Sequence, residues 1–219
     1  MHRKVDECDR QIESLLLQWI QEQEKQSGEQ RLEYSGKSKK VNKNDPRIDL
    51  QTFFYQLSGG IDISSIDGMG RNALLTIVSE TGLNMSAFPS AKHFCSWLRL
   101  APNNKITGKK VISSRTNQGR NRLAEALRHA ANSIGNMKEG ALQHFFKRIA
   151  YRKSRLAAIT ATARKVVVII WHMLTYKQNY IPEDQNAYLN KIRIIQLKNI
   201  QRKVKQLNVK PEELHFVRE

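Results

Sequence analysis

Apolar residues recur at helical spacing along most of the chain, with polar residues between them. This period predicts a mainly helical, all-α protein whose largest part is a helical bundle. Ser90 stands where its hydroxyl can cap a helix by accepting a free amide of the first turn. The helices predicted after the N-terminal one cover residues 50–57, 71–80, 90–99, 121–133, 139–153, 156–176 and 184–207.

The last two predicted helices have distinct faces. In the helix over 156–176, apolar residues alternate steps of three and four, which predicts one face buried in the core. These residues are Leu156, Ile159, Ala163, Val166, Ile170 and Met173. The helix over 184–207 has one apolar side and one basic side. The apolar side holds Leu197, Ile200, Val204 and Leu207, and the basic side holds Lys198, Arg202 and Lys205.

An apolar stripe with the a/d spacing of a coiled coil runs through residues 1–26. Its members are Val5, Cys8, Ile12, Leu15 and Trp19. Two interpretations fit the stripe: a helix that pairs with a second copy to form a homodimer or a larger assembly, and an amphipathic helix packed on its own domain. The pattern begins almost at Met1 without a clear cap, which is typical of a helix that continued upstream in a longer chain.

Composition divides the rest of the chain into three parts. Residues 27–46 are polar and charged with no apolar period, which predicts a linker. The sequence then predicts a domain over 47–180 and a basic C-terminal helix over 181–219. Inside the domain, the polar stretch from Ala101 to Gly119 predicts a small hairpin on either side of residues 107–110.

A net charge of +17 and a pI near 10.1 indicate a polyanionic partner. An anionic membrane would also attract this charge, but the most apolar stretch, Val166 to Leu174, is far shorter than the ~20 residues of a spanning helix. The N-terminus lacks the apolar region of a secretory signal, so we expect a cytoplasmic protein with no membrane partner. Cys8 and Cys95 form no metal-binding pair and are expected to be buried, reduced thiols.

The segment Ile-Asp-Gly-Met-Gly-Arg, residues 66–71, lies between two predicted helices. It is similar to the turn of helix-hairpin-helix modules, in which glycines let backbone amides approach a phosphate oxygen. Gly68, Gly70 and Arg71 are therefore candidate DNA contacts. The alternative is an ordinary glycine turn.

Between residues 105 and 128 the chain carries seven cations against one acid, Glu125. Short polar side chains are interleaved with the cations, as suits contacts to backbone phosphates. The candidate DNA contacts here are Lys105, Lys109, Lys110, Arg115, Arg120, Asn121, Arg122 and Arg128. Two more basic runs, 147–165 and 191–210, contain no acid and are either a second nucleic-acid surface or solvated helix faces.

The sequence offers little for a catalytic metal. Two-metal nucleases need several carboxylates around ions ~4 Å apart. Between residues 81 and 181 the only acids are Glu125 and Glu139, so we expect no metal site there. The six histidines form no HxxxH or comparable pair and are assigned no role. Any Mg²⁺ would have to be held by another domain.

A series of motifs resembles the C-terminal transposase domain of the DEDD insertion-sequence transposases, the Piv-like, bridge-RNA-guided family. The similarity covers nearly the whole chain, and the order and spacing of its pieces make it specific. The pieces are the coil with its polar linker, residues 66–70, 88–93 and 98–116, Asn121-Arg122, Ala126-Leu127-Arg128, and residues 159–165 and 171–174.

This resemblance implies that a RuvC-like N-terminal domain holds Mg²⁺ in the family, and we expect that domain to be missing here. It also implies that a serine in the loop after the Leu-x-Pro segment attacks a DNA phosphate to form a covalent intermediate. Thr107 stands at the matching position, where its methyl group restricts the rotamers available for in-line attack. Lys105, Lys109 and Lys110 could stabilise the phosphoryl charge.

The resemblance thus implies a domain that binds double-stranded DNA and acts in transposition by cleavage and strand exchange, but is inactive alone. A structured guide RNA is a second expected partner. The alternatives are a non-catalytic helix-hairpin-helix nucleic-acid-binding protein and a transposase remnant kept as a regulator. A ribosomal or other structured-RNA binder would explain the charge but not the resemblance of the loop.

Overall fold

The computed structural model describes residues 2–27, 32–36, 41–42, 45–108 and 110–208 of the 219-residue chain. These residues form eight α-helices, a short 3-10 helix and one two-stranded antiparallel sheet, so the predicted mainly helical fold is confirmed. In chain order the elements are α1 (His2–Ser27), α2 (Leu50–Leu57), η1 (Ile63–Ser65), α3 (Arg71–Thr81), α4 (Ala91–Trp97), β1 (Lys105–Thr107), β2 (Lys110–Ser113), α5 (Arg122–Gly135), α6 (Ala141–Arg152), α7 (Arg155–Tyr176) and α8 (Gln185–Gln206).

Helix α7 lies at the centre of the bundle and packs against α4, α5 and α6. Its side chains from Ala163 to Met173 on the predicted apolar face are buried, with Ala163 and Val166 fully enclosed. Leu156, in the first turn, is instead 77% exposed. Helix α3 packs on the outside of α5, and α2 packs on α3.

Of the described helices, α7 alone is long and apolar enough to cross a membrane by length and composition. Its burial among three other helices gives a different reason for that composition. A helix at the centre of a bundle meets apolar neighbours on several sides, so it needs few polar positions. We therefore regard α7 as the core helix of the domain.

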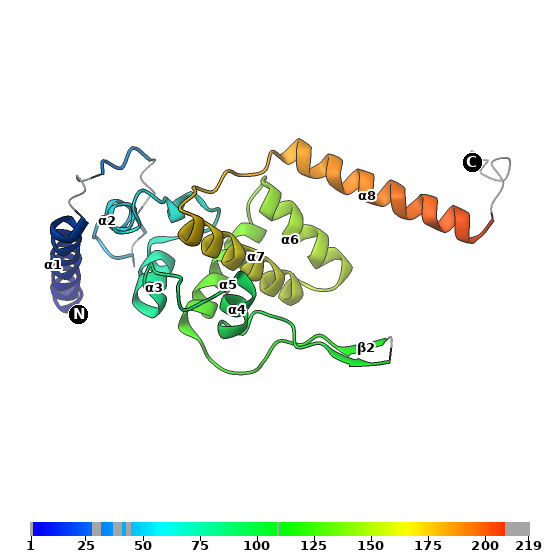
Figure 1. Ribbon diagram of the computed structural model, residues 1–219, viewed down its shortest axis with the longest axis horizontal. Helices are drawn as coiled ribbons and strands as arrows, with labels where there is room; N and C mark the ends of the chain where they lie inside the picture. Colours follow the sequence, from blue (N-terminus) through cyan, green and yellow to red (C-terminus); the bar gives the residue numbers. More distant parts are fainter. Residues whose placement is uncertain (1, 28–31, 37–40, 43–44, 109, 209–219) are drawn as a thin grey trace.

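Helix α1 stands at one end of the molecule beside α2 (Figure 1). Leu16 and Ile20 are the side chains that it buries in the core, and Ile12 is partly buried beside them. Elsewhere in the predicted stripe, Val5 is 54% and Leu15 63% exposed, whereas Trp19, 38% exposed, lines a cavity between α1 and the rest of the domain. The helix thus packs on its own domain with one side and leaves the a/d stripe largely uncovered.

Part of the predicted polar linker is anchored to the domain. The Tyr34 hydroxyl donates to a carboxylate oxygen of Asp62 at 3.3 Å and lies 3.2 Å from the Ser64 hydroxyl. The Tyr34 ring also packs edge-on against Tyr55, with 5.3 Å between the ring centroids. Burial raises the pKa of the Tyr34 hydroxyl.

Side-chain caps explain where several helices begin. Asp49, Ser154 and Asp184 each accept a hydrogen bond from a backbone amide in the first turn of α2, α7 and α8. Ser90 precedes α4 as predicted, but the predicted cap is wrong. Its hydroxyl forms a 2.8 Å hydrogen bond with His93 Nδ1 instead of binding a free amide, because the imidazole lies one turn further on and competes for it.

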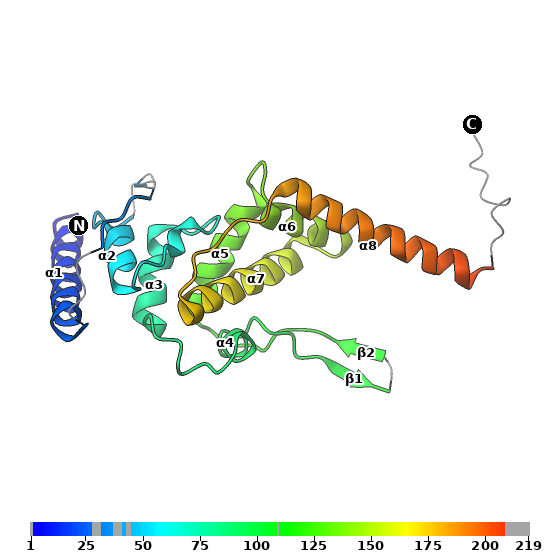
Figure 2. The same cartoon turned by 45° about the horizontal axis from the view of Figure 1, so that its top comes forward.

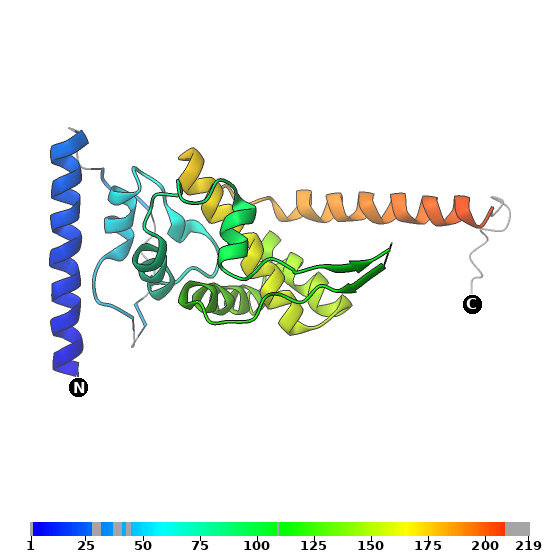
Figure 3. The same ribbon diagram turned by 60° about the horizontal axis from the view of Figure 1, so that its bottom comes forward.

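Two elements extend from the bundle at the end opposite α1 (Figures 2 and 3). One is the two-stranded ribbon of β1 and β2, and the other is α8. Tyr188 is buried at the start of α8, whereas Leu197, Ile200 and Leu207 are between 51% and 75% exposed. The described bundle therefore leaves most of the apolar side predicted for this helix uncovered.

Candidate nucleic-acid interface

The predicted hairpin turn lies between η1 and α3 and closes tightly on α5. Gly68 has a φ of +74°, and a Cβ at this position would lie 2.5 Å from the carbonyl oxygen of Ala130. Ile66 and Met69 on either side of it are buried. Gly70, at the N-cap of α3, is exposed, and a Cβ there would meet nothing within 4 Å. Gly68 thus serves the packing of the turn, and Gly70 stands at its open side.

Arg71 is placed differently from a phosphate-binding side chain. Only 7% of its surface is exposed. Its guanidinium donates to the carbonyl oxygen of Ile48 at 2.7 Å and to that of Pro46 at 3.4 Å. Arg71 therefore ties the chain before α2 to the start of α3 and presents little surface to a ligand.

Residues 102–116 form the projecting ribbon, which we call the arm. Its base is closed by a bridge between Pro102 and Thr116 and by a 2.9 Å hydrogen bond from the Asn103 amide to the Arg115 carbonyl oxygen. Below the base, the guanidinium of Arg99 donates to the carbonyl oxygen of Gln118. These contacts across the two sides fix the point at which the arm leaves the bundle.

Thr107 lies at the tip of the arm, at the end of β1. The residue is exposed and is followed by Gly108, whose φ of +58° allows the left-handed turn. Lys110 is its direct partner on β2. Side chains of directly paired residues stand ~5 Å apart at Cβ, so the Lys110 ammonium can reach a group bound at the Thr107 hydroxyl. Lys109 lies outside the described residues.

The cations of the arm are exposed. Lys105, Lys110 and Arg115 all lie on its surface, and Arg120 follows between the arm and α5. The side chain of Arg122, the first residue of α5, is 87% exposed and has one nitrogen 3.8 Å from a carboxylate oxygen of Glu80. An exposed pair at that distance contributes little and leaves Arg122 available to another anion.

Asn121 and Arg128 differ from this exposed set. The Asn121 side-chain oxygen accepts a 2.9 Å hydrogen bond from the Ala124 amide and so caps α5. Arg128 is half-buried two turns into that helix. The structure thus gathers five of the predicted contacts on the arm and at the start of α5 and gives Asn121 a capping role. The five are Lys105, Lys110, Arg115, Arg120 and Arg122.

A second cationic cluster joins α6, α7 and α8. Lys165 Nζ lies 4.8 Å from the centroid of the Phe145 ring and 5.6 Å from that of Tyr188, and Arg148 lies 5.6 Å from Phe145. Burial lowers the pKa of the Lys165 ammonium, Glu183 opposes this shift and Arg148 adds to it. The sequence showed the basic run but not this cluster, because its members lie far apart along the chain.

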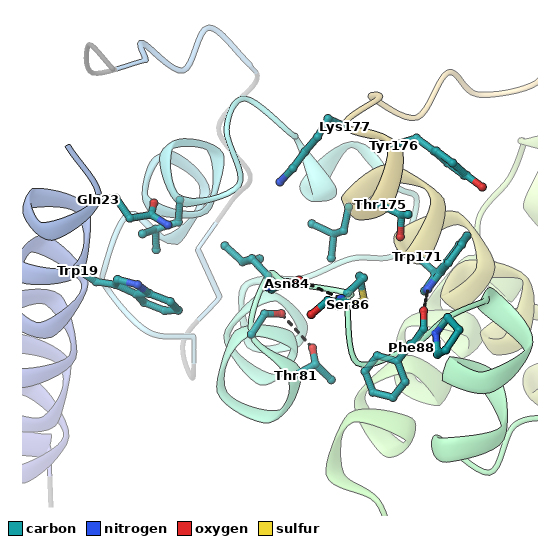
Figure 4. Close-up of a pocket in the computed structure, with 16 residues that line it drawn as sticks. Trp19, Gln23, Thr81, Asn84, Ser86, Phe88, Trp171, Thr175, Tyr176 and Lys177 are labelled. Carbon is teal, nitrogen blue, oxygen red and sulfur yellow. Dashed lines mark hydrogen bonds between the residues drawn. The ribbon is translucent and has the colours of Figure 1, made fainter. Parts of the chain in front are cut away.

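A cavity of about 740 Å³ lies between α1, α2, the α3–α4 loop and the end of α7 (Figure 4). Trp19, Phe88 and Trp171 contribute aromatic walls, and the Trp171 indole donates to the Phe88 carbonyl oxygen at 3.0 Å. Lys177 at the rim donates to the Ser58 carbonyl oxygen. Its described lining holds no carboxylate, histidine or cysteine and none of the predicted site residues.

Among the described residues, no three His, Cys, Asp or Glu side chains gather where they could hold a metal ion. Cys95 is buried, but Cys8 is exposed, so its predicted burial is wrong. The arm offers hydroxyl groups, with that of Thr107 at its tip, and several cations.

Comparison with known proteins identifies one segment of the chain. Residues 62–147 match the family model described as "Transposase IS116/IS110/IS902 family". No curated protein and no solved structure gave a match. Every predicted contact, from Gly68 to Arg128, lies inside the matched segment.

Proposed function

We propose that this chain, whose residues 62–147 form a transposase domain of the IS110 family, binds duplex DNA through the arm and the start of α5 during transposition. The domain indicates a role in transposition. The observation that supports the proposed DNA binding is that the arm is exposed and contains no acidic residue. We call Lys105, Lys110, Arg115, Arg120 and Arg122 the arm cations.

The charge of the arm suits a phosphate backbone. No Asp or Glu occurs from residue 101 to residue 124, so the arm cations face no acid along their own segment. DNA carries one negative charge per ≈1.7 Å of helix axis, and each cation that neutralises a phosphate releases a counterion. Such contacts position a protein on DNA without identifying its bases, so we assign the arm cations to positioning.

Thr107 supplies the hydroxyl at the position where the resemblance implies a serine nucleophile. In that step a bond forms between Thr107 Oγ and a DNA phosphorus, and the bond from that phosphorus to one deoxyribose oxygen breaks. The hydroxyl proton ends on the departing oxygen, so no oxidant or reductant is needed. Lys110, directly across the ribbon, is placed to stabilise the charge on the phosphoryl oxygens.

The resemblance also implies Mg²⁺, held by a RuvC-like domain. The described residues offer no carboxylate cluster that fits the ion, and we assign no step to it. The part proposed for this chain is to hold DNA and present the hydroxyl, in the cytoplasm at the nucleoid. A structured guide RNA and a second copy, paired through α1, are its proposed further partners.

The test is a salt titration with the full chain, a labelled duplex and, separately, a structured RNA. Between ~50 and ~200 mM salt, six to ten phosphate contacts should lower the affinity by roughly 10³ to 10⁵. Lys105→Ala/Lys110→Ala should make the slope of log K against log salt shallower by about 1.8, at ≈0.9 per phosphate contact. Lys4→Ala/Lys25→Ala on α1 removes the same charge at the opposite end and should leave the slope unchanged.

Equal slopes for both double variants would refute the arm as the binding surface. Binding to the RNA without binding to the duplex would refute duplex DNA as the partner. Thr107→Ala should bind like the parent protein, because the proposed role of Thr107 is chemical.

A non-catalytic nucleic-acid-binding protein is the second candidate function, and Thr107 at the serine position is the observation that favours it. A denaturing gel can separate the two, since a covalent protein–DNA adduct migrates with the protein. The first function predicts such an adduct with Thr107→Ser when a metal-binding nuclease domain is supplied. The second predicts that none forms.

A further inference from the structure

Two large apolar side chains lie uncovered on the arm. Ile106 is 60% exposed on β1, and Ile112 is 66% exposed on β2. Apolar side chains at these positions of a small ribbon would ordinarily cover the protein core. Here the ribbon extends away from the bundle, so neither isoleucine stabilises the described fold (Figure 2).

The ladder of the ribbon contains a bulge at this point. Lys105 pairs with Ser113 and Ile106 pairs with Val111, so Ile112 is an extra residue between the two pairs. A bulge bends the strand and re-aims a side chain, and bulges are frequent next to functional sites. The bulge therefore places Ile112 next to the pair that Ile106 forms with Val111, and Ile106 directly precedes Thr107.

We infer that Ile106 and Ile112 act as apolar wedges that unstack a base step of duplex DNA beside the phosphate held at Thr107. This inference rests on the proposed DNA binding by the arm. Proteins that insert aliphatic side chains between base steps kink the duplex in this way. The unstacking would open the backbone around one phosphate and give the Thr107 hydroxyl access to it.

Charge and shape favour duplex DNA over the other possible occupants of this surface. The isoleucines are flanked by Lys105, Lys110 and Arg115 with no acid nearby in the sequence, which suits a polyanion better than an ordinary protein surface. Two-stranded ribbons enter the major or the minor groove of B-DNA, and aliphatic wedges insert from the minor groove. The deep, narrow major groove of an RNA duplex does not admit protein side chains.

The experiment compares the affinity of the full chain for an intact duplex and for the same duplex with one central mismatch. A mismatched step is already partly unstacked, so a protein that inserts wedges should prefer it by about tenfold, equivalent to 1.4 kcal/mol. Ile106→Ala/Ile112→Ala should bring the ratio close to one and keep the salt slope, because the phosphate contacts remain. Ile106→Leu/Ile112→Leu should restore the preference.

Leu156→Ala/Ile181→Ala is the matched control, since both residues lie outside the arm and are highly exposed, at 77% and 86%. It should keep the mismatch preference. If the parent protein binds the two duplexes with an affinity ratio near one, the proposed wedge role is overturned and the proposed DNA binding stands. The same follows if Ile106→Ala/Ile112→Ala leaves the ratio unchanged. Loss of self-association in that variant with an unchanged ratio would assign the isoleucines to a protein contact instead. Absence of duplex binding in the parent would overturn both proposals.

Discussion

Gly68 approaches α5 so closely that a Cβ on this residue would lie 2.5 Å from the carbonyl oxygen of Ala130. The neighbouring obstacle is backbone, which cannot rotate away, and the φ of +74° is unfavourable for any side chain. We expect Gly68→Ala to lower the free energy of unfolding by about 2–4 kcal/mol. Urea denaturation followed by circular dichroism measures it.

Gly70 provides the control for this substitution. Its φ of −94° is open to all residues, and the space around it is free. Gly70→Ala should change the stability by less than about 1 kcal/mol. If both variants are equally stable, the close packing of the turn on α5 is wrong. If Gly70→Ala folds normally but loses DNA affinity, the helix-hairpin-helix interpretation gains support.

Substitutions of two neighbouring residues at the start of α5 should have different effects, one on the free energy of unfolding and the other on DNA binding. Asn121→Ala removes the cap on the Ala124 amide and should destabilise the protein by about 1 kcal/mol with little change in the salt slope. Arg120→Ala should do the reverse, with unchanged stability and a slope shallower by about 0.9. Thermal unfolding and the salt titration test the pair. A shallower slope in Asn121→Ala would mean that its side chain also contacts phosphate.

The exposed stripe on α1 predicts that the protein self-associates through this helix. Disulfide formation by the native Cys8 thiol can detect such pairing. Cys8 lies on the exposed side of α1, in the same heptad pattern as Leu15 and Trp19. In a parallel, in-register pair of α1 helices the two Cys8 thiols would meet. A mild oxidant should then give a disulfide-linked dimer on a non-reducing gel.

Two variants identify the thiol that reacts. Cys8→Ser should abolish the linked dimer, and Cys95→Ser should keep it because Cys95 is buried. A monomer at all concentrations in sedimentation, with no linked product, would refute pairing through α1.

Lys165 should lose its proton below the 10.5 of an ordinary lysine, because burial lowers its pKa. The folded state then binds fewer protons than the unfolded state, so the stability from this group rises as pH increases through the folded pKa toward 10.5. A ¹³C NMR titration of the lysine side chains, with Lys165→Met for assignment, measures the midpoint. Lys165→Met should also lack this rise in stability. A midpoint at or above 10.5 would contradict the prediction.

Many of the helices could be predicted from local sequence patterns. The helix at residues 50–57 was predicted at both ends from its apolar period, and the structure adds a cap by Asp49 at its start. The hairpin and the exposed Thr107 tip also follow from the polar, glycine-containing loop. In these places the interactions that decide the structure lie within a few residues of one another.

The errors come from contacts that local patterns do not reveal. On α1 the predicted stripe and the buried pair, Leu16 and Ile20, lie on adjacent parts of one wide apolar face, so periodicity alone does not select the side that packs. Arg71 was predicted as a DNA contact, and the sequence did not show that it is buried against the Ile48 carbonyl, 23 residues away. The Lys165 cluster escaped notice for the same reason, since its aromatic partners come from two other helices.

The arm and α8 project from the end of the bundle opposite α1 (Figure 3). Two chains joined through α1 would therefore carry their basic projections at the two outer ends of the assembly. Such an assembly could not clamp a single short duplex from both sides. It would instead act as a tether that holds two separate DNA segments at a fixed spacing, which is the arrangement that moving one segment into another requires.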